Sequence, residues 1–361
     1  MPSGNTRPSK QRPAEVAAEA KKQFIPIVKS NSQWQTFSYL YQEPLSQLAF
    51  VDPPRTLDPP EFYVQHGDPV DTAMQWAAQC GSPVPVICAA NDKRPGGDWE
   101  TGVCGYEERL CRRSSLAATL AIPGPGSHVE ANYPIPVFGA IWSQHVGKHP
   151  LVLEPPPLPP AVVFRGPHDG YEKRPMEDWK PLPVCSMAPM RWPKLTQNGT
   201  KYSFAKEREM VKAKLRGALR VCAYYNCTAV VIGDFGLGNA HRNPPEELAE
   251  LWREVFLYDP DLRGRIRHAA FVFDDPNQST AQLILDDMEK KSRGLGGGVG
   301  SGRTRSKSSN NTNPSSASSP PRSPGVSTDF DIFHRVFDSQ EVRRVMGQRD
   351  SRYGLDNLLT E

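Results

Sequence analysis

The fold is decided by residues 86–116, which read VICAANDKRPGGDWETGVCGYEERLCRRSSL. The apolar segment Val84–Ala90 predicts a buried strand, because a short apolar run bounded by turn residues is typical of strands covered on both faces. It leads into a loop containing Gly96 and Gly97, and a helix is expected from about Tyr106. Paired glycines let the backbone approach a ligand closely and present N–H groups that suit a phosphate or a ribose. Taken alone, such a loop is more often a plain tight turn.

A second glycine loop has the same architecture, in residues 230–245, which read VVIGDFGLGNAHRNPP. A β-branched strand ends there at Gly233, Gly236 and Gly238, and a helix is expected from the paired prolines. Ligands of open α/β sheets bind beyond the carboxyl ends of the strands. Two such loops on neighbouring strands are placed to hold a diphosphate from both sides, with helix N-termini adding favourable partial charge. The glycine spacing matches neither a P-loop nor a nicotinamide-type Rossmann loop.

A pair of adjacent acids, Glu107 and Glu108, opens the helix after the first loop. Adjacent helical residues point roughly 100° apart, so the two carboxylates should have different roles. One can face a ligand while the other faces solvent or an arginine. Acidic residues also favour the first turn of any helix, and Arg109, Arg112 and Arg113 offer partners, so a purely structural role is the competing interpretation.

Strands alternate with helices along the rest of the chain, which predicts an α/β domain with a mixed or parallel sheet. Asp71 is a candidate N-cap for one of these helices. Helices are expected at residues 12–24, 71–80, 204–222 and 244–256, and strands at residues 61–66, 161–165, 184–187, 229–232 and 268–273.

The segment PGGDWETGVCGYEERLCRRSSL resembles the signature of the microbial-type poly(ADP-ribose) glycohydrolases, a family with the macrodomain fold. That family shows an NPGGG-type turn, a spacer and a Gln-Glu-Glu followed by a Leu-Cys-Arg-Arg-Ser-like helix, and the alignment needs no gap. The segment VVIGDFGLGNAHRNPPEELAELWREVF resembles the family's diphosphate loop and the helix that follows it. Further similar blocks bring the extent of the resemblance to roughly residues 12–275; they are RPAEVAAEAKKQF, FYVQHGDPVDTAMQWA, VVFRGPHDGYE and VCSMAPMRWP.

The resemblance implies a macrodomain-like three-layer α/β fold with a mixed, mostly parallel sheet and helices on both faces. It also implies an ADP-ribose site at which an ADP-ribosyl glycosidic bond is hydrolysed. Glu108 would be the catalytic acid that protonates the leaving oxygen, and Glu107 would hold the ribose or orient the site. The glycines would line the diphosphate and ribose. The ligand-binding residues expected from the resemblance are Asn91, Gly96, Gly97, Gly233, Gly236, Leu237 and Gly238.

Several positions depart from the family pattern and leave more than one function open. Asp98 stands where the family has a third glycine, and it is either a second catalytic carboxylate or a charge that repels the ligand. Tyr106 replaces a glutamine, Cys88 an asparagine, and Asp234 and Ala240 the usual alanine and aromatic residue of the second loop. Three functions remain: a hydrolase of poly- or mono-ADP-ribosyl bonds, a non-catalytic ADP-ribose-binding module, and a scaffold with a vestigial pocket.

The composition of the chain narrows the classes of partner, compartment and cofactor that can be expected. The formal charge of +3 gives no indication of a nucleic-acid partner, and no apolar run of transmembrane length or signal peptide is expected. The seven cysteines include no C-x-x-C pair, so free thiols in the cytoplasm or nucleus are expected. No His, Cys and Asp cluster has metal-ligand spacing, so we expect neither a metal nor a cofactor. The expected partner is ADP-ribose or an ADP-ribosylated macromolecule.

The chain divides into four expected parts. Residues 1–11 form a flexible N-terminus, and residues 12–293 form the pocket domain with inserted loops. Residues 294–326 are rich in Gly, Ser and Pro without apolar periodicity, which is typical of a disordered linker. Residues 327–361 form a tail in which a short helix is expected around residues 339–346.

Overall fold

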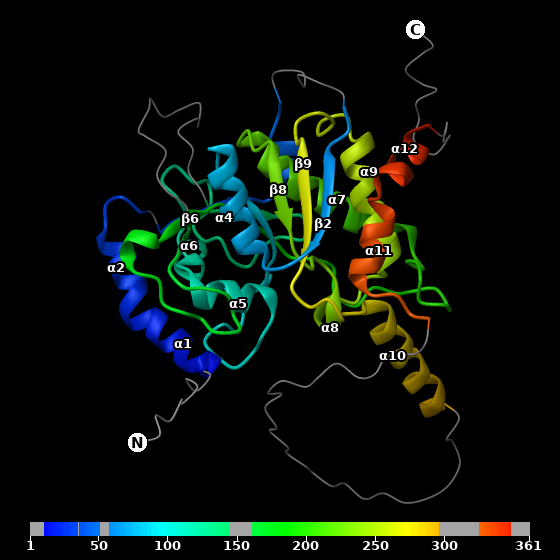
Figure 1. The fold of residues 1–361 in the computed structure, drawn as a ribbon, viewed down its shortest axis with the longest axis horizontal. Coiled ribbons are helices and arrows are strands. Elements are labelled where there is room, and N and C mark those ends of the chain that lie inside the picture. Colours follow the sequence, from blue (N-terminus) through cyan, green and yellow to red (C-terminus); the bar gives the residue numbers. More distant parts are fainter. Residues whose placement is uncertain (1–10, 35, 51–57, 144–160, 296–324, 348–361) are drawn as a thin grey trace, which may run out of the picture.

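A mixed β-sheet forms the centre of the computed structural model, which describes residues 11–34, 36–50, 58–143, 161–295 and 325–347 (Figure 1). Within these residues the sheet has seven strands in the order β1-β4-β7-β3-β8-β9-β2. The strands are β1 (Tyr39–Tyr41), β2 (Glu61–His66), β3 (Val86–Ala89), β4 (Ala140–Trp142), β7 (Val184–Met187), β8 (Ala229–Ile232) and β9 (His268–Phe273).

Most strand pairs of this sheet are parallel. Strands β7, β3, β8, β9 and β2 run in one direction, and β4 and β1 add antiparallel pairs at one side. The carboxyl ends of the five parallel strands therefore lie along the same edge, where α/β proteins place their ligands. The expected α/β fold with a mixed, mostly parallel sheet is confirmed.

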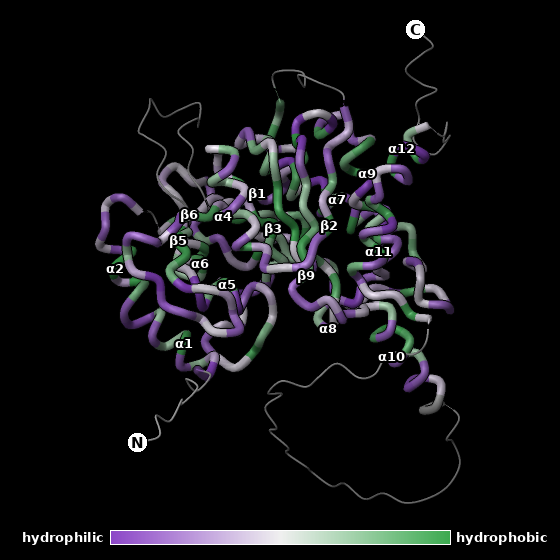
Figure 2. The backbone as a smooth tube through the Cα atoms, viewed as in Figure 1, coloured by the Kyte–Doolittle hydropathy of each residue, from purple (hydrophilic) through white to green (hydrophobic). Residues whose placement is uncertain are grey.

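Helices cover both faces of the sheet, because successive side chains of each strand point to opposite faces. In β8, Val230 and Ile232 pack in one buried cluster, while Val231 packs in the other. Figure 2 shows the central strands as the most hydrophobic part of the backbone. One cluster includes α7 (Ala205–Tyr224), α9 (Pro245–Tyr258) and α11 (Asp329–Val336); the other includes η1 (Ala20–Phe24), α2 (Ile25–Ser30), α4 (Pro69–Cys80), α5 (Tyr106–Arg113) and α6 (Leu116–Leu120).

Shorter elements complete the described part of the chain. The N-terminal helix starts as α1 (Pro13–Glu19) and continues through the π-helical turn η1 into α2, so it is longer than the expected 12–24. The others are α3 (Pro44–Gln47), the 3-10 turn η2 (Met176–Asp178), α8 (Gly238–His241), α10 (Thr280–Leu295) and α12 (Ser339–Gly347).

The start of α4 corrects the expected N-cap. Asp71 was the candidate, but the helix begins at Pro69 and its cap is Asp68, whose carboxylate accepts from the N–H of Val70 at 2.9 Å and of Asp71 at 3.0 Å. A proline at the first helical position has no N–H to satisfy, which favours the earlier start. The Asp71 carboxylate instead accepts from Arg113 of α5 at 2.9 Å.

The strand expected at residues 161–165 lies outside the main sheet. Its first three residues form β5 (Ala161–Val163), which pairs with β6 (Lys180–Leu182) in a separate antiparallel ribbon that packs against α6. Strand β4, which the sequence pattern did not indicate, occupies a place in the main sheet beside β7. With three residues, β4 is too short to show a periodic pattern.

The C-terminal segment packs into the body of the molecule. Helix α11 lies against α9 and β2, and Phe333 and Phe337 are buried among the aromatic side chains of the sheet (Figure 1). The packed body therefore continues beyond residue 293, where the sequence pattern placed the end of the domain. Residues 296–324 of the expected linker lie outside the described residues, and residues 294–295 end α10. The helix expected around residues 339–346 is present as α12.

No helix in the described ranges combines the length and apolar character needed to cross a bilayer. The seven cysteines all lie in these ranges and are free thiols.

Candidate functional site

The two glycine loops leave the same edge of the sheet side by side. Strands β3 and β8 are parallel neighbours, with Val86 opposite Val231 and Ile87 opposite Ile232. The second loop begins beside the first residue of α5, since a Cβ added at Gly233 would lie 3.2 Å from the ring of Tyr106. The sheet topology thus brings together two segments more than 100 residues apart in the sequence.

Backbone amides of the first loop bind the two glutamates of α5. The N–H of Asn91 donates to Glu107 Oε2 at 2.7 Å, and the N–H of Asp98 donates to Glu108 Oε1 at 3.2 Å. The N–H of Gly97 donates to the carbonyl of Arg94 at 3.2 Å. The sequence pattern assigned the N–H groups of the paired glycines to a phosphate or a ribose. In the structure the N–H of Gly97 closes the turn, and those of Asn91 and Asp98 hold the carboxylates.

Other side chains fill the space where the Cβ atoms of these glycines would lie: Trp99, Cys111 and Ala117 beside Gly96, and Glu108 beside Gly97 and Gly105. Gly96 and Gly97 have φ values of +73° and +56°, in the left-handed region that other residues rarely adopt. A Cβ at Gly97 would collide with Glu108 Oε1, and one at Gly105 would collide with Glu108 Oε2. The Glu108 carboxylate therefore lies between two glycines that leave room for it.

Glu107 is almost completely enclosed, with 2% of its surface exposed. Burial raises its pKa to about 8, and the neighbouring charge of Glu108 adds to the increase, while the amides of Asn91 and Gly96 and the charge of Arg191 oppose it. Its Oε1 atom has no hydrogen-bond partner among the described residues. Glu107 is therefore mainly protonated at neutral pH. Glu108 is only half-buried, so the two carboxyl groups have different surroundings.

The Asp98 side chain is directed toward Arg94, with which it forms an ion pair. The Asp98 side chain is 42% exposed, so the pair is largely solvated. The contact of this residue with Glu108 is made by its backbone N–H and not by its carboxylate. The backbone of Asp98 therefore helps to position Glu108, independently of the direction of the Asp98 side chain.

The second loop also relies on glycines in the left-handed region. Gly236 and Gly238 have φ values of +80° and +69°. The side chain of Asn243 donates to the carbonyl of Gly236 at 2.8 Å, and the N–H of Gly238 donates to Thr280 Oγ1 at 2.8 Å. Leu237 is buried in the core, and its N–H donates to the carbonyl of Asp234 at 2.9 Å.

Charged residues that the sequence pattern did not assign lie beside the second loop. Burial raises the pKa of Asp234 to about 6. The positive charge of Arg109 opposes this increase, and the negative charge of Asp274 adds to the increase. Arg109 of α5 forms an ion pair with Asp274 at 2.7 Å and a hydrogen bond with His168 at 3.2 Å. Asp274 directly follows β9, and its position at a strand end is the signal that could have revealed it.

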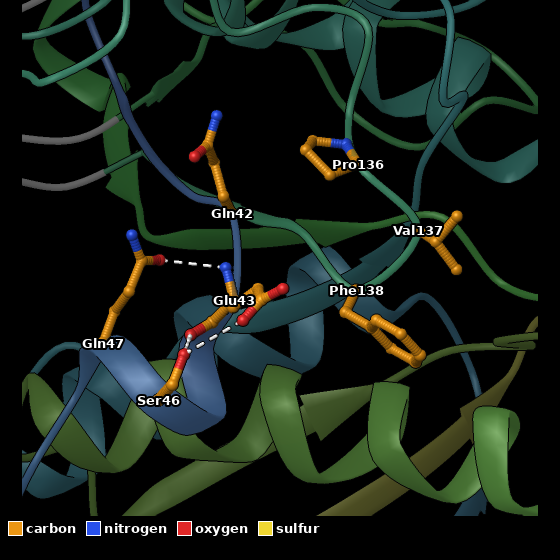
Figure 3. A pocket seen from close by; sticks show the side chains of 7 residues that line it. All are labelled: Gln42, Glu43, Ser46, Gln47, Pro136, Val137 and Phe138. Atoms are coloured by element: carbon orange, nitrogen blue, oxygen red, sulfur yellow. Dashed lines mark hydrogen bonds between the residues drawn. The ribbon is translucent and has the colours of Figure 1, made fainter.

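No group of three or more His, Cys, Asp or Glu side chains in the described ranges is arranged to hold a metal ion. A separate hollow of about 480 Å³ lies between α3 and the loop before β4 (Figure 3). Polar groups of this hollow form hydrogen bonds with one another; for example, the side chain of Gln47 accepts from the N–H of Glu43 at 2.9 Å. None of the expected site residues lines it; the lining residues are Gln42, Glu43, Ser46, Gln47, Pro136, Val137 and Phe138.

Comparison with known proteins points to the family that the sequence resembles. Residues 16–147 match the family model for the microbial-type PARG catalytic domain. The resemblance to this family is confirmed. The poly(ADP-ribose) glycohydrolase (PARG) of Thermomonospora curvata has a similar fold, with a TM-score of 0.52 and 16% sequence identity over 76% of this chain and 98% of that chain.

Two further PARG structures are similar to the chain. The T. curvata enzyme bound to the inhibitor ADP-HPD has a TM-score of 0.51 and 16% identity over 77% of this chain and 98% of that chain. The Deinococcus radiodurans enzyme in complex with ADP-ribose has a TM-score of 0.46 and 17% identity over 76% and 98%. No curated protein matches the chain by sequence. At 16% identity the two T. curvata matches show the fold alone.

Substitution of Gly105 tests whether the glycines position Glu108. Gly105 has an ordinary φ of −65°, so alanine fits its backbone, but the added Cβ must displace the flexible Glu108 carboxylate. We expect Gly105→Ala to leave the melting temperature nearly unchanged and to weaken any Glu108-dependent activity at least about tenfold, since small misplacements of reacting groups are costly. Gly102→Ala is the matched control, because nothing lies within 4 Å of its added Cβ. Equal activity of the two variants would contradict this account of Glu108.

The buried Glu107 carboxyl predicts a pH-dependent stability. Its folded-state pKa of about 8 exceeds the ordinary 4.5, so its favourable contribution is complete below pH 4.5 and is lost as the pH rises through 8. Wild type should lose several kcal/mol of unfolding free energy relative to Glu107→Gln between pH 5 and pH 8, at about 1.36 kcal/mol per pKa unit. Urea unfolding of both proteins across this range measures the difference. Parallel pH profiles would show that Glu107 does not carry the proton.

Proposed function

We propose that this chain is an ADP-ribosyl glycohydrolase that binds ADP-ribose between its two glycine loops and uses Glu108 as the catalytic acid. The observation that carries the proposal is the placement of Glu108. Its half-buried carboxylate is held between Gly97 and Gly105 by the N–H of Asp98, at the sheet edge where the two loops meet. The match of residues 16–147 to the PARG catalytic domain adds support for this chemistry.

Glu108 would protonate the oxygen that leaves the ribose carbon. The glycosidic C–O bond then breaks through an oxocarbenium-like transition state, and a water molecule adds to the ribose carbon. The products are free ADP-ribose and the released hydroxyl, and the proton lost by the attacking water replaces the one that Glu108 gave up. Glu107, protonated at neutral pH, adds no negative charge beside Glu108, and its bond from the N–H of Asn91 would orient the site from beneath the ligand.

The backbones of the two glycine loops would make most of the contacts with the ligand. Gly96 and Gly97 would follow the ribose and the proximal phosphate, and Gly233, Gly236, Leu237 and Gly238 would cover the diphosphate. The left-handed glycines support this role, because a chain without Cβ atoms can approach phosphate oxygens closely. The substrate class that follows is an ADP-ribosylated macromolecule, either with a poly(ADP-ribose) chain or with a single ADP-ribosyl group.

A non-catalytic ADP-ribose-binding module is the second candidate, favoured by Asp234. Its carboxyl group lies in the loop that would cover the diphosphate, and burial raises its pKa to about 6. The charge of Arg109 offsets that of an ionised Asp234, so the altered loop can still accept a doubly charged ligand. This candidate predicts ADP-ribose binding without turnover of either substrate form.

Release of ADP-ribose decides between the two candidates. Poly- and mono-ADP-ribosylated proteins should be incubated with wild type and with Glu108→Gln, and free ADP-ribose quantified. We expect wild type to release ADP-ribose from at least one substrate and the variant to be slower by about 10² to 10⁴, as is typical when a general acid is lost. Glu100→Gln is the control, because Glu100 lies in the same loop but faces solvent and pairs with Lys21. Equal turnover by Glu108→Gln would refute the assignment.

A further inference from the structure

The second glycine loop is hydrogen-bonded to the C-terminal segment through one buried threonine. The N–H of Gly238 donates to Thr280 Oγ1 at 2.8 Å, and this hydroxyl donates to Asp329 Oδ2 at 2.7 Å. The N–H of Thr280 donates to Asp329 Oδ1 at 2.8 Å. Thr280 is the first residue of α10 and Asp329 the first of α11, so the chain of bonds links three elements at the carboxyl edge of the sheet (Figure 1).

Asp329 is fully buried, and its carboxylate is surrounded by donors. Gln278 Nε2 also donates to Oδ2 at 2.9 Å, and the N–H of Asp329 donates to the carbonyl of Gln278 at 2.9 Å. Within the described residues no cation forms an ion pair with this carboxylate, so its charge is stabilised by hydrogen bonds alone. Burial of the Asp329 carboxylate is unfavourable in itself. Capping of a helix does not require a buried carboxylate, so capping alone does not explain this position.

The partners of Asp329 fix the conformation of Gly238 from two sides. Thr280 accepts the Gly238 N–H, while the side chain of Gln278 lies so close that a Cβ added at Gly238 would be 3.2 Å from Gln278 Oε1. Gly238 has a φ of +69°, which the loop must hold as it enters α8. Since its N–H already donates to Thr280, Gly238 would cover the diphosphate without donating to it, and hydrogen bonds to the phosphates are left to other amides.

Aromatic packing holds α11 in the position that this network requires. The ring of Phe330 stacks on His66 at the end of β2, with centroids 3.7 Å apart, and meets Phe273 at the end of β9 edge-on at 6.1 Å. Phe333, one turn later, is buried against Phe271 and Phe273. The first turn of α11 is therefore anchored at the same sheet edge as the two glycine loops.

We propose that Asp329 is a positioning residue that holds the Gly238 loop in its ligand-binding shape through Thr280, so that the segment after residue 325 completes the ADP-ribose site. The inference rests on the proposed function, because it assumes that the second loop contacts the ligand. It assigns a role in ligand binding to a segment that lies outside the stretch matching the PARG catalytic domain.

The test compares two substitutions of Thr280 in the full chain by calorimetric titration with ADP-ribose. Thr280→Val keeps the shape but removes the hydroxyl, and Thr280→Ser keeps the hydroxyl. We expect Thr280→Val to raise the Kd about tenfold, the size typical of a buried donor left without a partner, and Thr280→Ser to stay within about twofold of wild type. Asp329→Ala should weaken binding at least as much as Thr280→Val.

Two controls separate positioning from general stability. Val336→Ala removes buried methyl groups from the far end of α11 and should lower the melting temperature without a matching change in Kd. Asp338→Asn alters an exposed cap of the same segment, which accepts from the N–H of Gln340, and should bind as wild type does. If Kd follows the melting temperature in all variants, or if Thr280→Val binds like Thr280→Ser, the inference is wrong. Absence of binding by wild type would reject the proposed function as well.

Discussion

The structure of the site depends on how two adjacent carboxyl groups are accommodated at the start of α5. Glu107 points into the protein and gives up almost all contact with water, which raises its pKa to about 8. Glu108 remains half-buried and receives the N–H of Asp98. The loop before the helix surrounds the Glu108 carboxylate, for which Gly97 and Gly105 leave the necessary space. The result is a site with one protonated and one more accessible carboxyl group.

The sheet determines what faces these acids. Since β3 and β8 are parallel neighbours, the loop that follows β8 must lie beside the loop that holds Glu108. The second loop keeps its shape through bonds from side chains that come later in the chain, above all Asn243 and Thr280. Asp329 extends this support into α11. Ligand binding, in this account, depends on residues from most of the described length of the chain.

Much of the fold could be predicted from the sequence, because several strands of the sheet are apolar runs. Strands β3, β7, β8 and β9 are of this kind, and β3 and β8 also lead into the two glycine loops. Strand β4 was missed because three residues carry no periodicity. The strand β5 was expected, but a local pattern could not show that it pairs with β6 in a separate ribbon. Docking of α11 could not be foreseen, since its aromatic contacts are made with strands far away in the sequence.

The site was predictable in its residue types but not in its hydrogen bonds. The glycines and the acid pair stand out in the sequence, yet only the structure shows that the amides of Asn91 and Asp98 bind the acids. The direction of the Asp98 side chain toward Arg94 was equally hidden, because it depends on the turn between them. Asp329 gave no sequence signal at all, since it lies beyond a long stretch without apolar periodicity.

Calorimetric titration of the full chain with ADP-ribose tests the central claim most directly, with Gly97→Glu as the control. A glutamate at position 97 would place a second side chain in the space of the Glu108 carboxylate and force a φ of +56° on a residue other than glycine. The account predicts saturable binding by wild type that the control abolishes while remaining folded. A folded wild-type protein that produces no binding heat would contradict it, and only the fold would then stand.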